Sequence, residues 1–181
     1  MFKVNDLMVY GSTGVCRVEA IGVPAGLPDG MGPHQYYTLR PLHDTGVIYA
    51  PVDSNIFMRP VVTREEAENL ISGIPEIRAE ECASSSPQLL SEHYRTFFAS
   101  HNCEDLLQLI KTVYTKTHRS LSAGRQMGRT DQRYLQRAEQ LLYEEFSVAL
   151  GIPLDEVKPY IERRMHELEA AARGRSKTDQ A

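Results

Sequence analysis

Hydrophobic and polar residues alternate along the chain up to about residue 63, and the alternation then stops. The alternating part contains five short runs rich in β-branched and aromatic residues, which is typical of strands. These runs are "DLMVY", "VCRVEAI", "HQYYTLRPL", "GVIYAPV" and "IFMRPVV". Five short strands at such close spacing favour a small, strongly bent β barrel over an open sheet.

Turn-forming residues separate these predicted strands. The tetrapeptide "GSTG" joins the first two strands into a hairpin, and "HDTG" joins the third to the fourth. Residues 22–34, "GVPAGLPDGMGPH", are rich in glycine and proline and predict a surface loop. We expect the first hairpin to present an open strand edge with which another element pairs.

From residue 63 onward the hydrophobic residues recur with the period of a helix. Thr63 and Glu66 have the spacing of a capping box, and Gly73 is placed to end this first helix. The following segment, residues 73–87, has two prolines and a serine cluster. It predicts a linker that holds at most one helical turn.

Three more helix starts and one helix end are marked by single residues. Ser86 is a candidate N-cap with Pro87 as the first helical residue, and Asn102 is a candidate N-cap for the next helix. Thr130 is expected to begin the longest helix, which Gly151 ends. A last helix covers "IPLDEVKPYIERRMHELEAAAR".

These patterns together predict an α+β protein with two domains. We expect a small five-stranded β barrel over residues 1–63 and a connecting helix with a linker over residues 64–86. An all-helical domain is expected over residues 87–173, before a disordered tail at residues 174–181. Within the last helix, we expect Pro159 to separate a short opening turn from the rest.

Composition sets the broad class of the protein. A chain of 181 residues with 41% hydrophobic and 24% charged residues has enough apolar residues for one good core or two small ones. No stretch is long and apolar enough to span a bilayer, and the first residues do not resemble a secretory signal. We therefore expect a soluble cytoplasmic protein whose Cys16, Cys82 and Cys103 stay reduced.

The charge distribution is more informative than the net charge of −4. An acidic protein is a poor unaided ligand for nucleic acid, because non-specific binding depends on Lys and Arg at phosphates. Residues 109–140, here called the basic segment, are the exception. Their basic residues are Lys111, Lys116, Arg119, Arg125, Arg129, Arg133 and Arg137. This segment is either a solvated helix face or a phosphate-binding surface next to a helix N-terminus.

Leu90 is the one hydrophobic residue with a candidate role at DNA. Apolar residues on a helix are normally core residues. Leu90, however, follows the opening Pro87 closely and lies near Arg95 in the sequence. If its side chain points outward, it has the character of a wedge for the minor groove.

Motifs for catalysis, metal or phosphate loops are weak. His101 and Cys103 flank Asn102, but around a helix cap their side chains are expected to diverge. The six histidines show no metal-ligand spacing, and "GSTG" joins two strands rather than a strand and a helix. We expect no catalytic residues, no metal and no cofactor.

Five stretches of the sequence resemble the CarD family of bacterial transcription regulators, whose N-terminal domain also occurs in the transcription-repair coupling factor. The barrel part is carried by "FKVNDLMVYGSTGVCRVEAI", "YAPV" and "RPVVTREEAENLI". The helical part is carried by "LSAGRQMGRTDQRYLQRAEQLLYEEFSVALG" and "VKPYIERR". The resemblance extends from residue 2 to about residue 170.

This resemblance implies a non-enzymatic regulator with two partners. The barrel would be an SH3-like or Tudor-like module. It would dock on the β subunit of RNA polymerase, partly by strand pairing, and thereby associate with the nucleoid. The helical domain would contact promoter DNA without base-specific readout at the upstream edge of the melted bubble. It would modulate the stability of the open complex, for example at rRNA promoters. The oligomeric state stays open.

The resemblance also implies candidate contact residues. For polymerase they are Arg17, Pro24, Arg40, Val47, Tyr49 and Pro51. For DNA they are Leu90, His93, Arg95, Lys111, Arg125, Arg129, Gln132 and Arg133. The chain has no tryptophan, and Leu90 stands where the family usually carries a tryptophan wedge.

Two other functions remain open from the sequence. The first is a polymerase-binding adaptor that makes no contact with DNA. The second, more distant, is a thiol hydrolase that uses Cys103.

Overall fold

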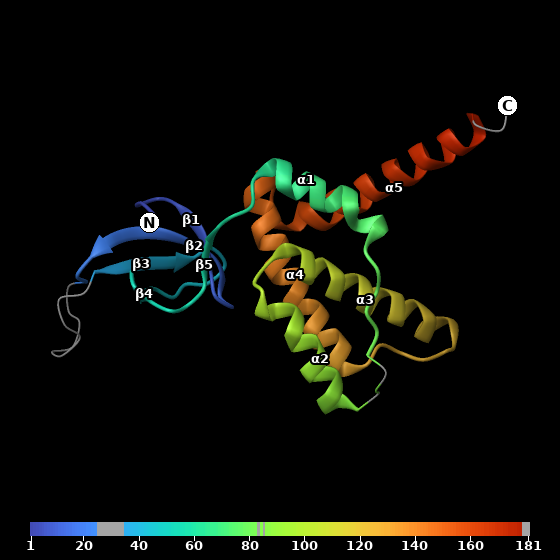
Figure 1. Cartoon of the computed structure of the whole chain (residues 1–181), viewed down its shortest axis with the longest axis horizontal. Helices are drawn as coiled ribbons and strands as arrows, with labels where there is room; N and C mark the ends of the chain where they lie inside the picture. Colours follow the sequence, from blue (N-terminus) through green and yellow to red (C-terminus); the bar gives the residue numbers. More distant parts are fainter. Residues whose placement is uncertain (25–34, 83, 85, 179–181) are drawn as a thin grey trace. The chain divides into compact units, whose positions relative to one another are not determined.

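The computed structural model describes residues 1–24, 35–82, 84 and 86–178 (Figure 1). The chain divides into two compact units, Met1–Val61 and Val62–Ala181, here called the sheet unit and the helical unit. The predicted barrel ended two residues later, at residue 63. The segment predicted as a connector, residues 64–86, belongs to the helical unit. Most of the predicted loop at residues 22–34 lies outside the described residues.

The sheet unit contains the five predicted strands. Their bounds are β1 Leu7–Tyr10, β2 Gly14–Gly22, β3 Tyr36–Pro41, β4 Ile48–Pro51 and β5 Met58–Pro60. The first hairpin turn has Gly11 at φ 47° and Gly14 at φ 101°. Both angles lie in the region that glycine adopts without a steric cost, which explains the "GSTG" sequence.

The strands form one antiparallel sheet in the order β4-β3-β2-β1-β5. The expectation of an open edge at the first hairpin is wrong for β1, because β1 pairs with both β2 and β5. For example, Met8 is opposite Cys16 on one side and Pro60 on the other. The edge strands are therefore β4 and β5.

Alternation along the strands gives the sheet one buried face. The core of the sheet unit consists of Met8, Tyr10, Cys16, Val18, Tyr37, Leu39 and Ala50. Cross-strand neighbours lie on the same face of a sheet. Arg17 and Arg40, which alternate with members of this set along β2 and β3, lie on the other face and are exposed.

The helical unit contains five α-helices and one short 3₁₀ helix in its described part. Their bounds are α1 Arg64–Gly73, η1 Ile74–Glu76, α2 Pro87–Ala99, α3 Cys103–Ser122, α4 Arg129–Leu150 and α5 Leu154–Thr178. The turn η1 is the single helical turn that was predicted in the linker. The combination of an antiparallel sheet and an all-helical second part confirms the α+β class.

Most of the predicted helix ends are confirmed by their local geometry. Thr63 and Glu66 form both bonds of the capping box, and the Asn102 side chain accepts the N–H of Asp105. Gly151 ends α4 in the left-handed conformation at φ 65°. Ser86 is at the N-cap position of α2, but its side chain makes no capping bond.

Four predictions about the last two helices and the tail are wrong. Helix α4 begins at Arg129 rather than at Thr130, and the longest helix is α5, with 25 residues. Pro159 lies inside α5, where it removes one backbone hydrogen bond without ending the helix. The expected tail is helical as far as Thr178, and residues 179–181 lie outside the described residues.

The core of the helical unit is formed by all five α-helices. Its largest fully buried side chains include Tyr94, Phe146, Ile71, Leu109 and Leu142. On α2 the buried residues Leu90, Tyr94 and Phe97 follow a spacing of four and three, which places them on one stripe of the helix. The position of this stripe decides which side chains of α2 reach solvent.

Candidate functional site

The sheet unit presents a polar face made by residues of β2, β3 and β4. In the register of the sheet, Arg17 is opposite Arg40 and Thr38 is opposite Tyr49. Because Thr38 and Arg40 alternate along β3, all four side chains lie on one face. Four of the predicted polymerase residues, Arg17, Arg40, Tyr49 and Pro51, therefore share this face.

The charges on this face are partly compensated. Arg40 forms a bidentate ion pair with Glu19, in which Nη2 is 3.2 Å from Oε2. The hydrogen bond from Arg40, together with the charges of Arg40 and Arg17, lowers the pKa of Glu19 despite its partial desolvation. Arg17 is exposed beside this pair, so the face keeps a positive charge.

The open strand edge lies next to this face, on β4. Val52 N–H donates to the carbonyl of Gln35 at 3.0 Å. In an antiparallel ladder the bonded and open positions alternate, so the backbone groups of Tyr49 and Pro51 face the open side. Pro51 lacks an N–H, which limits pairing at that end.

Two hydrophobic side chains are exposed at this edge. The Tyr49 side chain is 47% exposed, and Val47, directly before β4, is also exposed. An exposed tyrosine beside unpaired backbone groups is suited to a protein partner. The sixth predicted residue, Pro24, is half-buried just beyond β2.

In the helical unit, the structure corrects the prediction for Leu90. Its side chain is only 5% exposed and belongs to the core. The neighbouring Leu89 is 50% exposed. The expectation that Leu90 points outward is therefore wrong, because Leu90 shares the buried stripe of α2 with Tyr94 and Phe97.

A buried carboxylate holds α2, α3 and α4 together. Asp131 on α4 is 5% exposed. Its Oδ1 accepts the Tyr94 hydroxyl at 2.7 Å and the Lys116 ammonium at 2.8 Å. Burial, together with the bond to Asp131, raises the pKa of Tyr94 well above its ordinary value. Lys116, a member of the basic segment, is therefore a structural residue.

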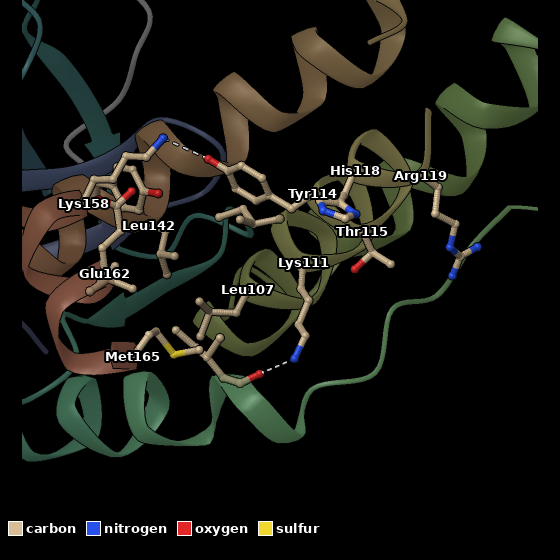
Figure 2. Close-up of a pocket in the computed structure, with 14 residues that line it drawn as sticks. Leu107, Lys111, Tyr114, Thr115, His118, Arg119, Leu142, Lys158, Glu162 and Met165 are labelled. Atoms are coloured by element: carbon tan, nitrogen blue, oxygen red, sulfur yellow. Dashed lines mark hydrogen bonds between the residues drawn. The ribbon is translucent and has the colours of Figure 1, made fainter. Parts of the chain in front are cut away.

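Two further cations of the basic segment are bonded within the fold. Lys111 donates to the carbonyls of Ile74 at 2.7 Å and Pro75 at 2.9 Å, as Figure 2 shows for Ile74. Arg119 pairs with Glu81 at 2.7 Å. The structure thus places Lys111 where it caps the end of α1 and η1, on the side of α3 that faces them.

Lys111 also lines a cavity of about 700 Å³ within the helical unit (Figure 2). Its walls come mainly from α3, α4 and α5 and are largely apolar. Lys158 reaches the Tyr114 hydroxyl at 2.9 Å and Glu139 at 3.6 Å. No residue of this cavity except Lys111 was a candidate from the sequence.

The remaining basic residues form a different surface on α2 and α4. Arg95 and Arg133 are exposed and come together at Tyr134. The guanidinium of Arg133 lies 4.9 Å from the centre of the Tyr134 ring, and its Nη2 is 3.5 Å from Ser91 Oγ. We call Ser91, Arg95, Arg133 and Tyr134 the arginine cluster.

The ring and the hydroxyl of Tyr134 have different environments. The ring packs against Tyr94 and Phe98. Burial by itself raises the pKa of the hydroxyl, but the neighbouring Arg95 and Ser91 side chains and the charges of Arg95 and Arg133 outweigh it and lower this pKa. The cluster is therefore a region of positive potential.

Other predicted DNA residues have separate positions. Arg125 precedes α4, Arg129 is its first residue, and Gln132 lies in its first turn, and all three are exposed. His93 is half-buried and its Nε2 is 3.0 Å from the carbonyl of Glu80. His93 therefore ties α2 to the segment before it.

The Cys103 thiol lies in the core. It is 1% exposed and its Sγ is 3.3 Å from Glu145 Oε2. The other oxygen of Glu145 accepts the N–H of Val62 at 3.0 Å. This geometry is that of a structural thiol that helps to fix the start of the helical unit, and it does not favour nucleophilic catalysis.

Two searches of the described residues gave no site. They contain no group of three or more His, Cys, Asp or Glu side chains arranged to hold a metal ion. Within the same residues, no helix combines the length and the apolar character needed to cross a membrane.

Sequence reasoning missed Ser91 and Tyr134. Ser91 and Arg95 are four residues apart on α2, and this spacing places them on one face of the helix. Tyr134 was assigned to the apolar side of α4. Its position directly after Arg133 was the available signal for a cation–aromatic contact.

Comparison with known proteins gives one family match. Residues 2–62 match the CarD-like/TRCF RID domain, which is an RNA-polymerase-interacting domain. The comparison with curated proteins finds no match to the chain. The matched residues cover the sheet unit, with its polar face and open β4 edge, and stop where the helical unit begins. Residues 2–62 of this chain are therefore similar to the CarD-like/TRCF RID domain, which is consistent with a CarD-like protein.

Proposed function

We propose that the chain is a transcription regulator that docks on the β subunit of RNA polymerase through the β4 edge and the polar face. The observation that carries this proposal is the open edge at Tyr49 in a domain of a polymerase-interacting family. A strand of the partner would pair with the free backbone groups of β4. Tyr49, Val47 and Arg17 would supply side-chain contacts.

The helical unit then contacts promoter DNA at the upstream edge of the melted bubble. The support is a contrast among the basic residues of the helical unit. Lys116 and Arg119 have carboxylate partners, whereas Arg95 and Arg133 have none among the described residues. Cations without carboxylate partners are the ones available to phosphates.

Docking on polymerase explains how an acidic protein acts on DNA. A net charge of −4 opposes binding to free DNA. Once the sheet unit is held on polymerase, the helical unit meets promoter DNA at a high effective concentration. Weak phosphate contacts are then sufficient to stabilise the open complex, with rRNA promoters as one example.

Leu89 replaces Leu90 as the candidate side chain for insertion between base steps of the DNA. Leu89 is in the first turn of α2 and is exposed. Ser91 and Arg95 of the arginine cluster follow on the same helix. An exposed leucine is apolar and large enough to unstack a step in a minor groove.

Alanine substitutions at the two leucines separate stability from function. We expect Leu90→Ala to lower the free energy of unfolding by about 2–4 kcal/mol, because it empties part of the core. Leu89→Ala should change it by less than about 0.5 kcal/mol. Chemical unfolding measures both values. In promoter complexes, Leu89→Ala should shorten the lifetime of the open complex; an unchanged lifetime would exclude Leu89 as the wedge.

The DNA contact itself is tested by salt dependence. For Arg95→Ala and Arg133→Ala, the slope of log affinity against log salt in promoter complexes should become shallower by about one unit per lost phosphate contact. Arg119→Ala is the matched control, because Arg119 is a cation of the basic segment that is already paired with Glu81. Its slope should equal that of the unmodified chain.

The same experiment distinguishes the alternative of an adaptor. If neither Arg95→Ala nor Arg133→Ala changes the slope while binding to polymerase persists, the chain acts through polymerase alone. The compensated cations Lys116 and Arg119 are what favour this alternative.

A further inference from the structure

The geometry points to a seat for a single phosphate group in the arginine cluster, built from two helices, with Tyr134 as its positioning residue. This inference rests on the proposed DNA contact and adds to it the residues that organise the site. Ser91 and Tyr134 carry no charge, so the basic pattern of the sequence does not reveal them. The Tyr134 hydroxyl and the two guanidinium groups of Arg95 and Arg133 form the seat, and Ser91 contacts Arg133 beside it.

The first support is the convergence of two positive charges from different helices. Arg95 comes from α2 and Arg133 from α4, and both act on the same Tyr134 hydroxyl. In the described part of the chain, no carboxylate forms an ion pair with either guanidinium. Two such groups repel each other unless an anion lies between them. A phosphate, which accepts paired N–H bonds from arginine, meets this requirement.

The second support is the way in which Tyr134 is held. Its ring lies edge-on to Tyr94, with centroids 5.5 Å apart, and against Phe98 at 6.1 Å. Tyr94 is itself fixed by its bond to the buried Asp131. The ring of Tyr134 is therefore anchored to the core, while its hydroxyl extends to the surface of α2.

The third support is that this anchored side chain orients both arginines. The guanidinium of Arg133 lies over the ring at 4.9 Å, and Arg95 hydrogen-bonds the hydroxyl. Ser91 contacts Arg133 as well, and its own hydroxyl donates to the carbonyl of Pro87 at 2.7 Å. Long side chains that are oriented before binding lose less conformational entropy when the anion arrives.

The test uses the full chain and inorganic phosphate as the probe. Titration is followed by the Nε–Hε resonances of the arginine side chains in NMR spectra. Phosphate should shift the signals of Arg95 and Arg133 together, with one dissociation constant. Tyr134→Phe keeps the ring and removes the hydroxyl, and it should raise this constant about fivefold, as expected for the loss of one charge-assisted hydrogen bond.

Arg137→Ala is the matched control, because Arg137 lies one turn further along α4 and bonds Gln140. It should leave the phosphate constant unchanged. The seat is excluded if phosphate shifts neither Arg95 nor Arg133, or if Tyr134→Phe binds phosphate as tightly as the unmodified chain. A fivefold effect of Tyr134→Phe on phosphate with no effect on promoter complexes would support the seat and contradict the proposed DNA contact.

Discussion

Replacing Asp131 with alanine is expected to lower the free energy of unfolding of the helical unit by about 2–4 kcal/mol. The substitution leaves the buried Tyr94 hydroxyl without its acceptor and Lys116 without its counter-charge. Breaking a fully buried ion pair can lower the free energy of unfolding by more than this. A smaller loss is expected here, because the Lys116 side chain is 35% exposed. The arginine cluster depends on the same contact between α2 and α4, so DNA contact should weaken as well.

Two further variants separate the contributions to this network. Asp131→Asn keeps an acceptor for Tyr94 and should cost less than the alanine change. Tyr94→Phe removes only the hydroxyl and should cost about 1 kcal/mol. Chemical unfolding followed by circular dichroism measures all three. An Asp131→Ala protein as stable as the unmodified chain would show that the buried carboxylate does not hold the helices together.

Replacing Tyr49 with aspartate is expected to weaken binding to polymerase by about 30-fold or more. Tyrosine is a frequent anchor at protein interfaces, and the Tyr49 side chain is the largest exposed group at the open β4 edge. An aspartate there also adds a negative charge beside Glu19 and the Arg40 pair on the polar face. Affinity is measured with the full chain and polymerase by titration calorimetry.

Val4→Asp is the matched control for this substitution. Val4 is 48% exposed, almost the same as Tyr49, and it precedes β1, which is not a neighbour of β4 in the sheet. The control introduces the same charge on a hydrophobic site of equal exposure. If both variants lose the same affinity, the effect is one of net charge and the β4 edge is not the docking surface.

The features that were predicted correctly depend on short stretches of sequence. The five strands follow from alternation between turn residues, and Thr63, Asn102 and Gly151 act within one turn of their helix ends. These features can be predicted from the local sequence, because each capping residue bonds backbone groups that are only a few residues away.

The features that were missed depend on contacts between distant residues. Strand β1 has β5 as a neighbour because Met8 pairs with Pro60, and these two residues are far apart in the sequence. Lys116 meets Asp131 fifteen residues away, and Arg119 meets Glu81 across 38 residues. A count of basic residues along the basic segment cannot show that Lys116 and Arg119 are bonded within the fold.

Leu90 is an intermediate case, because the deciding signal was present in the sequence. The spacing of Leu90, Tyr94 and Phe97 matches a single buried stripe, and Leu89 falls outside it. The resemblance to the CarD family instead drew attention to Leu90 by its position. Helical periodicity was the better guide to which side chain reaches solvent.

The central claim is that the sheet unit gives the chain its place on RNA polymerase, and binding of the full chain to the isolated β subunit tests it most directly. We expect a dissociation constant of about 1–10 µM, typical of a small interface. The same titration with Tyr49→Asp should show little binding. Absence of binding by the unmodified chain at about 100 µM would contradict the account.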